Sequence, residues 1–315
     1  EPIRLDSVER AIADVAAGRA LVVVDDEDRA NEGDIIFAAA KATPELMAFT
    51  VRHSSGVICV PMPAEILDRL EIPLMTPHNR DRMRTQFTIS VDARQGVTTG
   101  ISAADRARTV SVAIDAGKTA EDIVTPGHVF PLLAQEGGVL VRAGHTEASV
   151  DIARLAGLNA SGVICEIMNE DGTMARLEDL MRFGRRHGLK MGTIRDLIAY
   201  RRRHDHLVEK RAEGRFHSRW GGEWRAISFY NKATKGETMA LVKGHIDPAR
   251  PTLVRMHAMA IFDDVFAQDT ERYGMLEGAM RIIGEEGAGV VVLISRPSPG
   301  YASRAIEGLD EKRPP

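Results

Sequence analysis

Cysteine is scarce in this chain, long apolar runs are missing, and neither sign of charge dominates. Only Cys59 and Cys165 are cysteines; their number excludes a disulfide-rich scaffold and their spacing excludes a cysteine zinc site. Both lie in apolar stretches, so we expect two buried, reduced thiols. The net charge of -4 gives no global attraction to nucleic acid, so we expect no such partner. Without an apolar run of bilayer length or a leader pattern, we also expect no membrane partner and a cytoplasmic location.

The length and composition predict an ordinary globular protein with two domains. The 315 residues exceed a typical single domain, and the hydrophobic fraction of 44% and charged fraction of 27% are near average. Along the first two-thirds of the chain, helical periodicity alternates with apolar runs typical of buried strands. These patterns predict the α/β (α+β) class, with helices over 8–17, 43–53, 102–116 and 147–156, the last capped by Thr146, and strands over 20–24, 86–91 and 162–165.

A stretch dense in charge, residues 201–214, separates two parts of the chain. It has few apolar residues and is typical of a helix end that runs into a linker. We therefore place the first domain at 1–203, a charged linker at 204–214 and a smaller α/β domain at 215–315. In the second domain the patterns predict strands over 223–230, 238–242, 251–257 and 289–295, a helix over 275–286 and a polar tail over 307–315.

An acidic run and a basic, glycine-containing segment are the first candidates for chemistry. Residues 25–34 (DDEDRANEGD) hold six carboxylates directly after the apolar residues 21–24, which indicates either a Mg²⁺-binding loop at a strand end or a solvated acidic turn. Residues 142–146 (RAGHT) place a cation, a possible metal ligand and a hydroxyl at a helix start. Free amides and the helix dipole favour a phosphate there.

Three further segments each allow a functional and a structural interpretation. Residues 96–102 (GVTTGIS) suit an oxyanion cradle or a simple turn with a helix cap. His128 lies between Pro126 and Pro131, a rigid frame that suits proton transfer or a packed loop histidine. Glu166 follows the apolar run 162–165 and is either an acid/base group or a solvated carboxylate at a strand end.

Together these segments resemble 3,4-dihydroxy-2-butanone 4-phosphate synthase, a family that converts D-ribulose 5-phosphate to formate and a four-carbon phosphate in riboflavin biosynthesis. The resemblance covers residues 3–203. It rests on the strings DDEDRANEGD (25–34), RHSSGVICV (52–60), GVTTGISAADR (96–106), GHVFPL (127–132), GGVLVRAGHTEASVDIARLAG (137–157) and GVICEI (162–167). An unrelated sugar-phosphate-binding domain is the less favoured alternative.

The resemblance implies roles for particular residues. His145 would bind Mg²⁺ or Mn²⁺, which would polarise the ketone of the substrate. The catalytic set would be His128, Glu166, Glu32, Asp34 and Cys59. The substrate would contact Arg29, Asp34, Arg142, Ala143, Gly144, His145, Thr146 and Glu166. In a homodimer with shared active sites, the 98–109 segment would reach into the neighbouring site with Thr98, Ser102, Arg106 and Thr109.

The sequence departs from the resembled family at Ala30. The family pattern is Arg-Glu-Asn-Glu-Gly-Asp, and its first Glu is the carboxylate that holds the metal ion. Alanine cannot coordinate a cation, so we expect strongly reduced synthase activity. The alternative is a catalytically silent protein that serves regulation or assembly in riboflavin biosynthesis.

The C-terminal part faintly resembles GTP cyclohydrolase II. The similarity rests on TLVRMH (252–257), DVF (264–266) and GEEGAGV (284–290). That family holds zinc with three cysteines, and the aligned positions here carry Ala260, Glu271 and Tyr273. A catalytic segment is also replaced by RPSPG (296–300). We therefore expect a degenerate domain without zinc and without cyclohydrolase activity.

Overall fold

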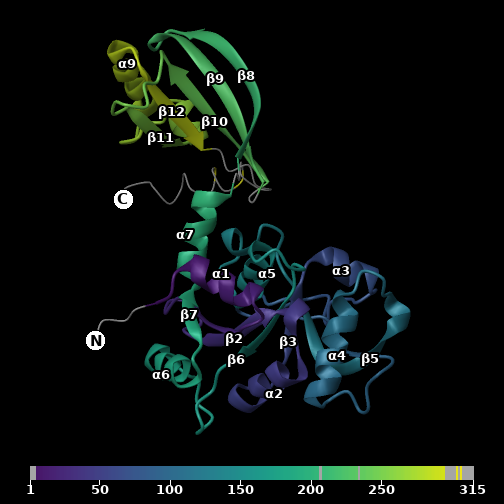
Figure 1. The fold of residues 1–315 in the computed structure, drawn as a ribbon. Helices are drawn as coiled ribbons and strands as arrows, with labels where there is room; N and C mark the ends of the chain where they lie inside the picture. Colours follow the sequence, from purple (N-terminus) through teal and green to yellow (C-terminus); the bar gives the residue numbers. More distant parts are fainter. Residues whose placement is uncertain (1–4, 206–207, 233–234, 295–302, 304–305, 307–315) are drawn as a thin grey trace, which may run out of the picture. The chain divides into compact units, whose positions relative to one another are not determined.

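The computed structural model describes residues 5–205, 208–232, 235–294, 303 and 306. The chain divides into two compact units, residues 1–205 and 206–315. Both units combine helices with a β-sheet (Figure 1), which confirms the predicted α/β class. Among the described residues, no helix is long and apolar enough to cross a membrane.

The first unit is built on a mixed sheet. In the described residues its strand order is β4-β5-β3-β6-β2-β1-β7. The strands are β1 (Leu21–Val24), β2 (Gly33–Ala38), β3 (Cys59–Met62), β4 (Val91–Ala93), β5 (Ile123–Leu133), β6 (Gly162–Glu166) and β7 (Lys190–Thr193). The helices are α1 (Val8–Ala16), α2 (Pro44–His53), α3 (Ala64–Arg69), α4 (Ala103–Ile114), α5 (His145–Leu155), α6 (Leu177–His187) and α7 (Ile194–His204).

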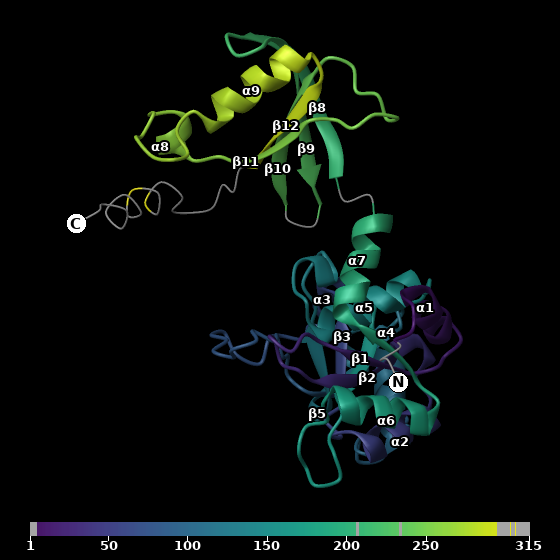
Figure 2. The ribbon, with the colours of Figure 1, turned by 90° about the vertical axis from the view of Figure 1, so that its left-hand side faces the viewer.

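Helices cover both faces of this sheet. The core on one face draws on α1, α5 and α7, and the core on the other draws on α2, α3, α4 and α6. Figures 1 and 2 show α1, α5 and α7 on one side of the strands and α2 and α6 on the other. Because both faces of the sheet are covered, an inner strand such as β1 (Leu21–Val24) is buried along its whole length, and its sequence is an unbroken apolar run.

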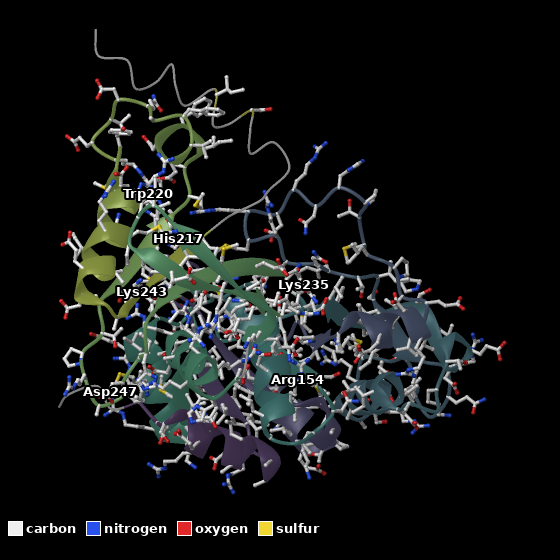
Figure 3. The ribbon with its side chains drawn as sticks, turned by 90° about the horizontal axis from the view of Figure 1, so that it is seen from above. Arg154, His217, Trp220, Lys235, Lys243 and Asp247 are labelled. Atoms are coloured by element: carbon white, nitrogen blue, oxygen red, sulfur yellow. The ribbon has the colours of Figure 1, made fainter. Side chains whose placement is uncertain are left out.

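The second unit is a sheet with one long helix across it (Figure 2). In the described residues the strand order is β11-β12-β10-β9-β8. Trp224 and Leu241 of the sheet pack against Met280 and Ile283 of the helix. At the β8–β9 turn, Lys243, which is labelled in Figure 3, donates hydrogen bonds to the carbonyls of Gly221 and Glu223 at 2.5 and 3.0 Å. The elements are β8 (Val208–Ser218), β9 (Gly222–Asn231), β10 (Gly236–Lys243), β11 (Val254–Ala258), α8 (Ile261–Asp264), α9 (Met275–Glu286) and β12 (Gly289–Ile294).

Three local predictions need correction. The predicted strand 86–91 is largely irregular, and only residues from Val91 onward form β4. The predicted linker 204–214 contains the start of β8 at Val208; this strand is exposed along most of its length, so it lacks the apolar face that pattern reading requires. Helix α5 begins at His145 with Gly144 as its cap, so Thr146 lies inside the first turn. Ser295 and the predicted tail 307–315 lie outside the described residues.

Candidate active site

Asp34 and Glu166 lie side by side at one edge of the first sheet. Asp34 near the start of β2 is paired in register with Glu166, the last residue of β6. Two residues further into each strand, Ile36 and Ile164 belong to the core that includes Ala148 of α5. Because alternate residues of a strand share a face, both carboxylates project toward the side covered by α5.

His128 and Cys59 lie at the same edge. Cys59 opens β3 and pairs with Ile164 of β6 on one side and with Phe130 of β5 on the other. His128 precedes Phe130 by two residues, and Glu166 follows Ile164 by two, in the same direction along the sheet. Two strand spacings, about 10 Å, therefore separate the backbones of His128 and Glu166. A small substrate fits between side chains at that separation.

The acidic run folds around Asp25. This carboxylate is buried, and it accepts hydrogen bonds from the Arg29 guanidinium at 2.8 Å, from the Ala30 amide at 3.3 Å and from the Glu32 amide at 2.9 Å. Asn31 takes a positive φ of 54°, a conformation that asparagine tolerates. The run is therefore an ordered loop between β1 and β2, and residue 30 lies at its turn.

His145 presents a nitrogen lone pair to Asp34. Its Nε2 lies 3.0 Å from the Val23 carbonyl, which can only accept, so Nε2 carries the proton and Nδ1 is free to bind a cation. Burial lowers the pKa of His145 to about 4, so the ring is neutral at pH 7. Nδ1 lies 3.7 Å from Asp34 Oδ1, and this buried oxygen has no hydrogen-bond partner. Two acceptors that face each other in this way fit a cation between them.

Repulsion among carboxylates acts in the same place. Burial raises the pKa of Asp34 well above its usual value, and the charges of Glu166, Glu32 and Asp25 raise it further. Burial and the charge of Glu166 likewise raise the pKa of Glu32. Arg29 is a nearby cation that opposes both shifts. A divalent ion would relieve this repulsion, although the described residues contain no group of three protein side chains arranged to hold a metal ion.

The N-terminus of α5 and two arginines form a candidate anion site. No side chain caps this helix, and Thr146 is buried in its first turn. A Cβ atom at Gly144 would overlap the Arg142 guanidinium and lie 3.0 Å from Arg29 Nη2, so glycine is needed for both arginines to approach the helix end. Positive charge and free helix amides together suit a phosphate.

A cavity of about 330 Å³ opens beside this helix end. It lies between the acidic loop and α7 and combines arginine side chains with apolar ones. Its lining residues are Asp26, Arg29, Ala143, Ile194, Arg195, Ile198, Ala199 and Arg202. The predicted substrate residues Arg29 and Ala143 therefore share one cavity.

Arg142 is held by several partners. It donates to Glu147 at 2.6 Å, and to the Met83 carbonyl and the Thr85 hydroxyl at 3.0 Å each. Glu147 is almost completely buried, and its burial raises its pKa. Arg142 thus joins the irregular segment around residue 84 to the start of α5.

His128 is paired with Asp92 of β4. Asp92 accepts from the His128 amide at 2.9 Å and lies 2.7 Å from Nδ1, so Nδ1 carries the proton and Nε2 is available to accept one. The His128 side chain is 41% exposed, whereas that of Asp92 is 8% exposed. Gly100, at a φ of +93°, lies so close to this pair that a Cβ atom would overlap Asp92. The arrangement suits a solvent-accessible general base whose orientation is fixed.

Glu166 is oriented by Ser55. The Ser55 hydroxyl donates to Glu166 Oε2 at 3.1 Å, and the Ser55 amide donates to the Glu166 carbonyl at 2.7 Å. Cys59 and Cys165 are free and buried, as predicted. Burial raises the pKa of both thiols, so Cys59 is a protonated lining group at neutral pH.

The 98–109 segment makes internal contacts. Thr98 donates to Asp105 at 2.7 Å, and Ser102 caps α4 by accepting from the Asp105 amide. Thr109 is fully buried and accepts from the Ala93 amide. Arg106 donates to the carbonyl of Gly56 at 3.1 Å, close to Ser55 of the site in its own protomer. A contribution of this segment to a neighbouring subunit stays a prediction.

In the second unit, the three positions that the resemblance aligns with zinc cysteines carry Ala260, Glu271 and Tyr273. Ala260 caps the short helix α8, and Glu271 and Tyr273 lie in the exposed turn before α9. The nearby titratable pair, His257 and Asp264, is buried, with 2.9 Å between Nε2 and Oδ1.

Sequence reading missed the residues that orient the site. Asp25, Ser55, Asp92 and Glu147 each hold a predicted site residue by hydrogen bonds. Asp25, Ser55 and Glu147 lie in the strings that carry the family resemblance, but the sequence did not indicate which partner each would hold, and Asp92 lies outside those strings. Asp92 and Ser55 act on partners 36 and 111 residues away, which no local pattern reveals.

The chain matches two protein-family models. Residues 9–200 match 3,4-dihydroxy-2-butanone 4-phosphate synthase, and residues 209–306 match GTP cyclohydrolase II. The predicted resemblances of both parts are therefore confirmed. The description of the second part as degenerate stays a prediction.

Relatives and solved structures agree with these matches. The riboflavin biosynthesis protein RibBA of Nocardia farcinica is 50% identical over 98% of this chain and 74% of its own length, and that of Mycobacterium tuberculosis is 49% identical over 98% and 73%. RibBX of A. baumannii, a two-domain 3,4-dihydroxy-2-butanone 4-phosphate synthase, has a TM-score of 0.78 and 38% identity over 96% of this chain and 87% of its own. A synthase structure in complex with two magnesium ions has a TM-score of 0.62 and 42% identity, over 64% of this chain and 99% of its own.

Proposed function

The chain belongs to the 3,4-dihydroxy-2-butanone 4-phosphate synthase family, and on this basis we propose that its first unit converts D-ribulose 5-phosphate to formate and 3,4-dihydroxy-2-butanone 4-phosphate. The reaction would depend on Mg²⁺ or Mn²⁺, and Ala30 would keep it slow. The observation that carries the proposal is the open pair of acceptors, His145 Nδ1 and Asp34 Oδ1, 3.7 Å apart. It lies beside a helix end that suits a phosphate.

The donors present fit a weakly held cation. His145 and Asp34 would hold it, and water and substrate oxygens would complete the shell, because Mg²⁺ prefers oxygen ligands and keeps several waters. Ala30 adds no ligand, and this is the reason for the expected slow rate. When bound, the ion would act as a Lewis acid that polarises oxygens of the substrate.

The side chains of this chain would orient the substrate and move protons. Arg29, Arg142 and the amides of α5 would bind the phosphate and so direct the sugar toward the sheet edge. His128, with Nε2 free and its ring fixed by Asp92, would accept a proton next to the ketone. Glu166, about two strand spacings away, would donate or accept protons on the opposite side of the substrate. Glu32, Asp34 and Cys59 would line the pocket.

A homodimer with shared active sites is part of this proposal. Ile101 is 51% exposed at the tip of the 98–109 segment, where an apolar side chain gains by contact with a second subunit. Light scattering of the full chain measures the mass directly, and a monomer would remove this part of the proposal.

The decisive test is formate release from ribulose 5-phosphate by the chain and by Ala30→Glu, with Mg²⁺ present. We expect detectable formate release by the natural chain and an increase of roughly a hundredfold or more in Ala30→Glu. Residues that only hydrogen-bond to a metal ligand already alter metal affinity by about 10- to 100-fold, and a direct ligand should have a larger effect. Calorimetric titration with Mg²⁺ should show tighter binding by Ala30→Glu.

Ala30→Gln is the matched control, because glutamine has the size of glutamate without its charge. It should raise the rate far less than Ala30→Glu does. Equal rates for the natural chain and Ala30→Glu would mean that position 30 does not hold the cation. If neither protein releases formate, the alternative of a silent regulatory or assembly protein is favoured, which the missing ligand at Ala30 supports.

For the second unit we propose that neither zinc binding nor GTP hydrolysis takes place. The support is the absence of thiols or other converging ligands at Ala260, Glu271 and Tyr273. Stoichiometric zinc in the purified protein, together with formate release from GTP, would overturn this proposal.

A further inference from the structure

Arg176 reaches the acidic loop from a distant part of the sequence. Its Nη1 donates to the carbonyl of Ala30 at 3.0 Å and also to the carbonyl of Asn31. These two carbonyls lie at the turn of the loop, where Asn31 takes its positive φ. One guanidinium group therefore fixes the backbone at the position whose side chain should face the cation.

The backbone next to Arg176 is hydrogen-bonded to Ile167, the residue that follows Glu166. The segment between β6 and α6 folds back on itself, with Ala175 donating to the Ile167 carbonyl at 3.1 Å. Ile167, next to Glu166, donates to the Gly33 carbonyl at the end of the acidic loop. The Arg176 amide is held by Asp179 at 3.0 Å. Arg176 thus closes a ring of contacts between the loop and the strand that carries Glu166.

Arg176 also affects the charge balance of the loop. Its positive charge lowers the pKa of Glu32, opposing the effects of burial and of Glu166. The side chain contacts the loop only through backbone carbonyls and lies on its exposed side. Its hydrogen bonds therefore act on the backbone of the loop.

We propose that Arg176 is a positioning residue that holds the turn of the acidic loop, and with it the side chain at position 30, in register with Asp34 and His145. This rests on the proposed function only in assigning cation binding to the loop. The contacts themselves predict that the loop loosens when the guanidinium is removed.

The test compares Arg176→Gln, Arg176→Lys and Arg182→Gln by hydrogen exchange of the full chain. Arg182 is the matched control, because it lies in α6, the helix that Arg176 caps, and pairs with Asp179 at 2.5 Å, while no hydrogen bond or ion pair joins it to the loop among the described residues. We expect amides of residues 25–34 to exchange roughly tenfold faster in Arg176→Gln, as loss of hydrogen bonds from a charged donor allows. Arg176→Lys should lie between, and Arg182→Gln should match the natural chain.

A second readout separates this role from general stability. In an Ala30→Glu background, Arg176→Gln should raise the Mg²⁺ concentration needed for half-maximal formate release by several-fold, with a smaller change in KM for the sugar phosphate. Unchanged exchange of the loop in Arg176→Gln, or equal loosening in Arg182→Gln, would overturn the inference. If no protein releases formate, the proposed function fails, while the exchange result still decides the role of Arg176.

Discussion

Each of the two units contains a histidine paired with an aspartate, and the two pairs differ in access to solvent. The His128 side chain of the first unit is 41% exposed and is hydrogen-bonded to Asp92. His257 of the second unit is 1% exposed and its partner Asp264 is 4% exposed. The heavy-atom distances are similar, 2.7 Å and 2.9 Å. Pair geometry alone therefore does not separate a site for chemistry from a structural contact.

The surroundings separate the two pairs. His128 lies at a sheet edge that also carries Glu166 and the open acceptors of Asp34 and His145. Asp264, by contrast, uses its second oxygen to accept from the Ala260 amide, so the pair ties β11 to α8. A titratable group becomes a candidate for catalysis when it is accessible and when other unsatisfied groups converge on the same space.

The largest expected effect concerns His128. Substitution His128→Gln keeps a hydrogen-bond donor near Asp92 but removes the basic nitrogen, so formate release should fall by about 10²- to 10⁴-fold. The measurement is best made in an Ala30→Glu background, where the starting rate is high. The unfolding midpoint should hardly move, because the ring is partly exposed.

If His128→Gln keeps a rate within a few-fold of the Ala30→Glu protein, the exposed pair is not the catalytic one, and the contrast between the two histidine–aspartate pairs is wrong. The control is His53→Gln, which changes a histidine of the same unit that lies in an aromatic cluster with Phe49 and His187. No loss of turnover is expected from that control.

The second effect is on stability, in the other unit. In His257→Gln the buried Asp264 loses a well-placed partner, so the second unit should lose about 2 to 3 kcal/mol of its free energy of unfolding. The chain contains two tryptophans, Trp220 and Trp224, both in this unit, so their fluorescence reports its unfolding alone. Formate release should stay at the parental rate; a large loss would mean that the buried pair also supports the synthase site.

The sequence predicted those features of the fold and the site that depend on local pattern. Helix and strand signals located α1, α2, α4, α5, β1 and β6 of the first unit, and the segments RAGHT and GVICEI placed His145 at a helix start and Glu166 at a strand end. Strand β8 was missed because a strand with solvent on both sides has no apolar face. Its charged edge is typical of strands that avoid pairing with other chains.

The parts that sequence reading could not predict are contacts over long separations. Arg176 and Ala30 are 146 residues apart, and His145 and Val23 are 122 apart. Only the folded sheet brings such groups together, because the strand order differs from the sequence order. Motifs therefore indicated the residues that would react, whereas they did not indicate which residues would orient them.

The smallest effect concerns Asp14, a buried acid that, like Asp92 and Asp264, has a basic partner. Asp14 lies outside the candidate active site. Hydrogen bonds and charge from Arg19 and Lys190 lower its pKa below 3.8. A carboxylate with a lowered folded-state pKa stabilises the protein above its unfolded-state pKa, and this contribution disappears as the pH falls through the folded-state pKa. Asp14→Asn should therefore cost about 1 kcal/mol at pH 7, and the difference should shrink below about pH 4.

One denaturant titration, followed by circular dichroism and by tryptophan fluorescence, tests the effect of Asp14→Asn on the stability of both units. The dichroism transition of the first unit should shift in Asp14→Asn, whereas the fluorescence transition of the second should not, because Trp220 and Trp224 lie in the second unit. Glu209→Gln removes the charge of an acid on β8 that pairs with Lys232, and it should leave both transitions unchanged. A difference for Asp14→Asn that persists undiminished at pH 2.5 would assign its effect to packing rather than charge.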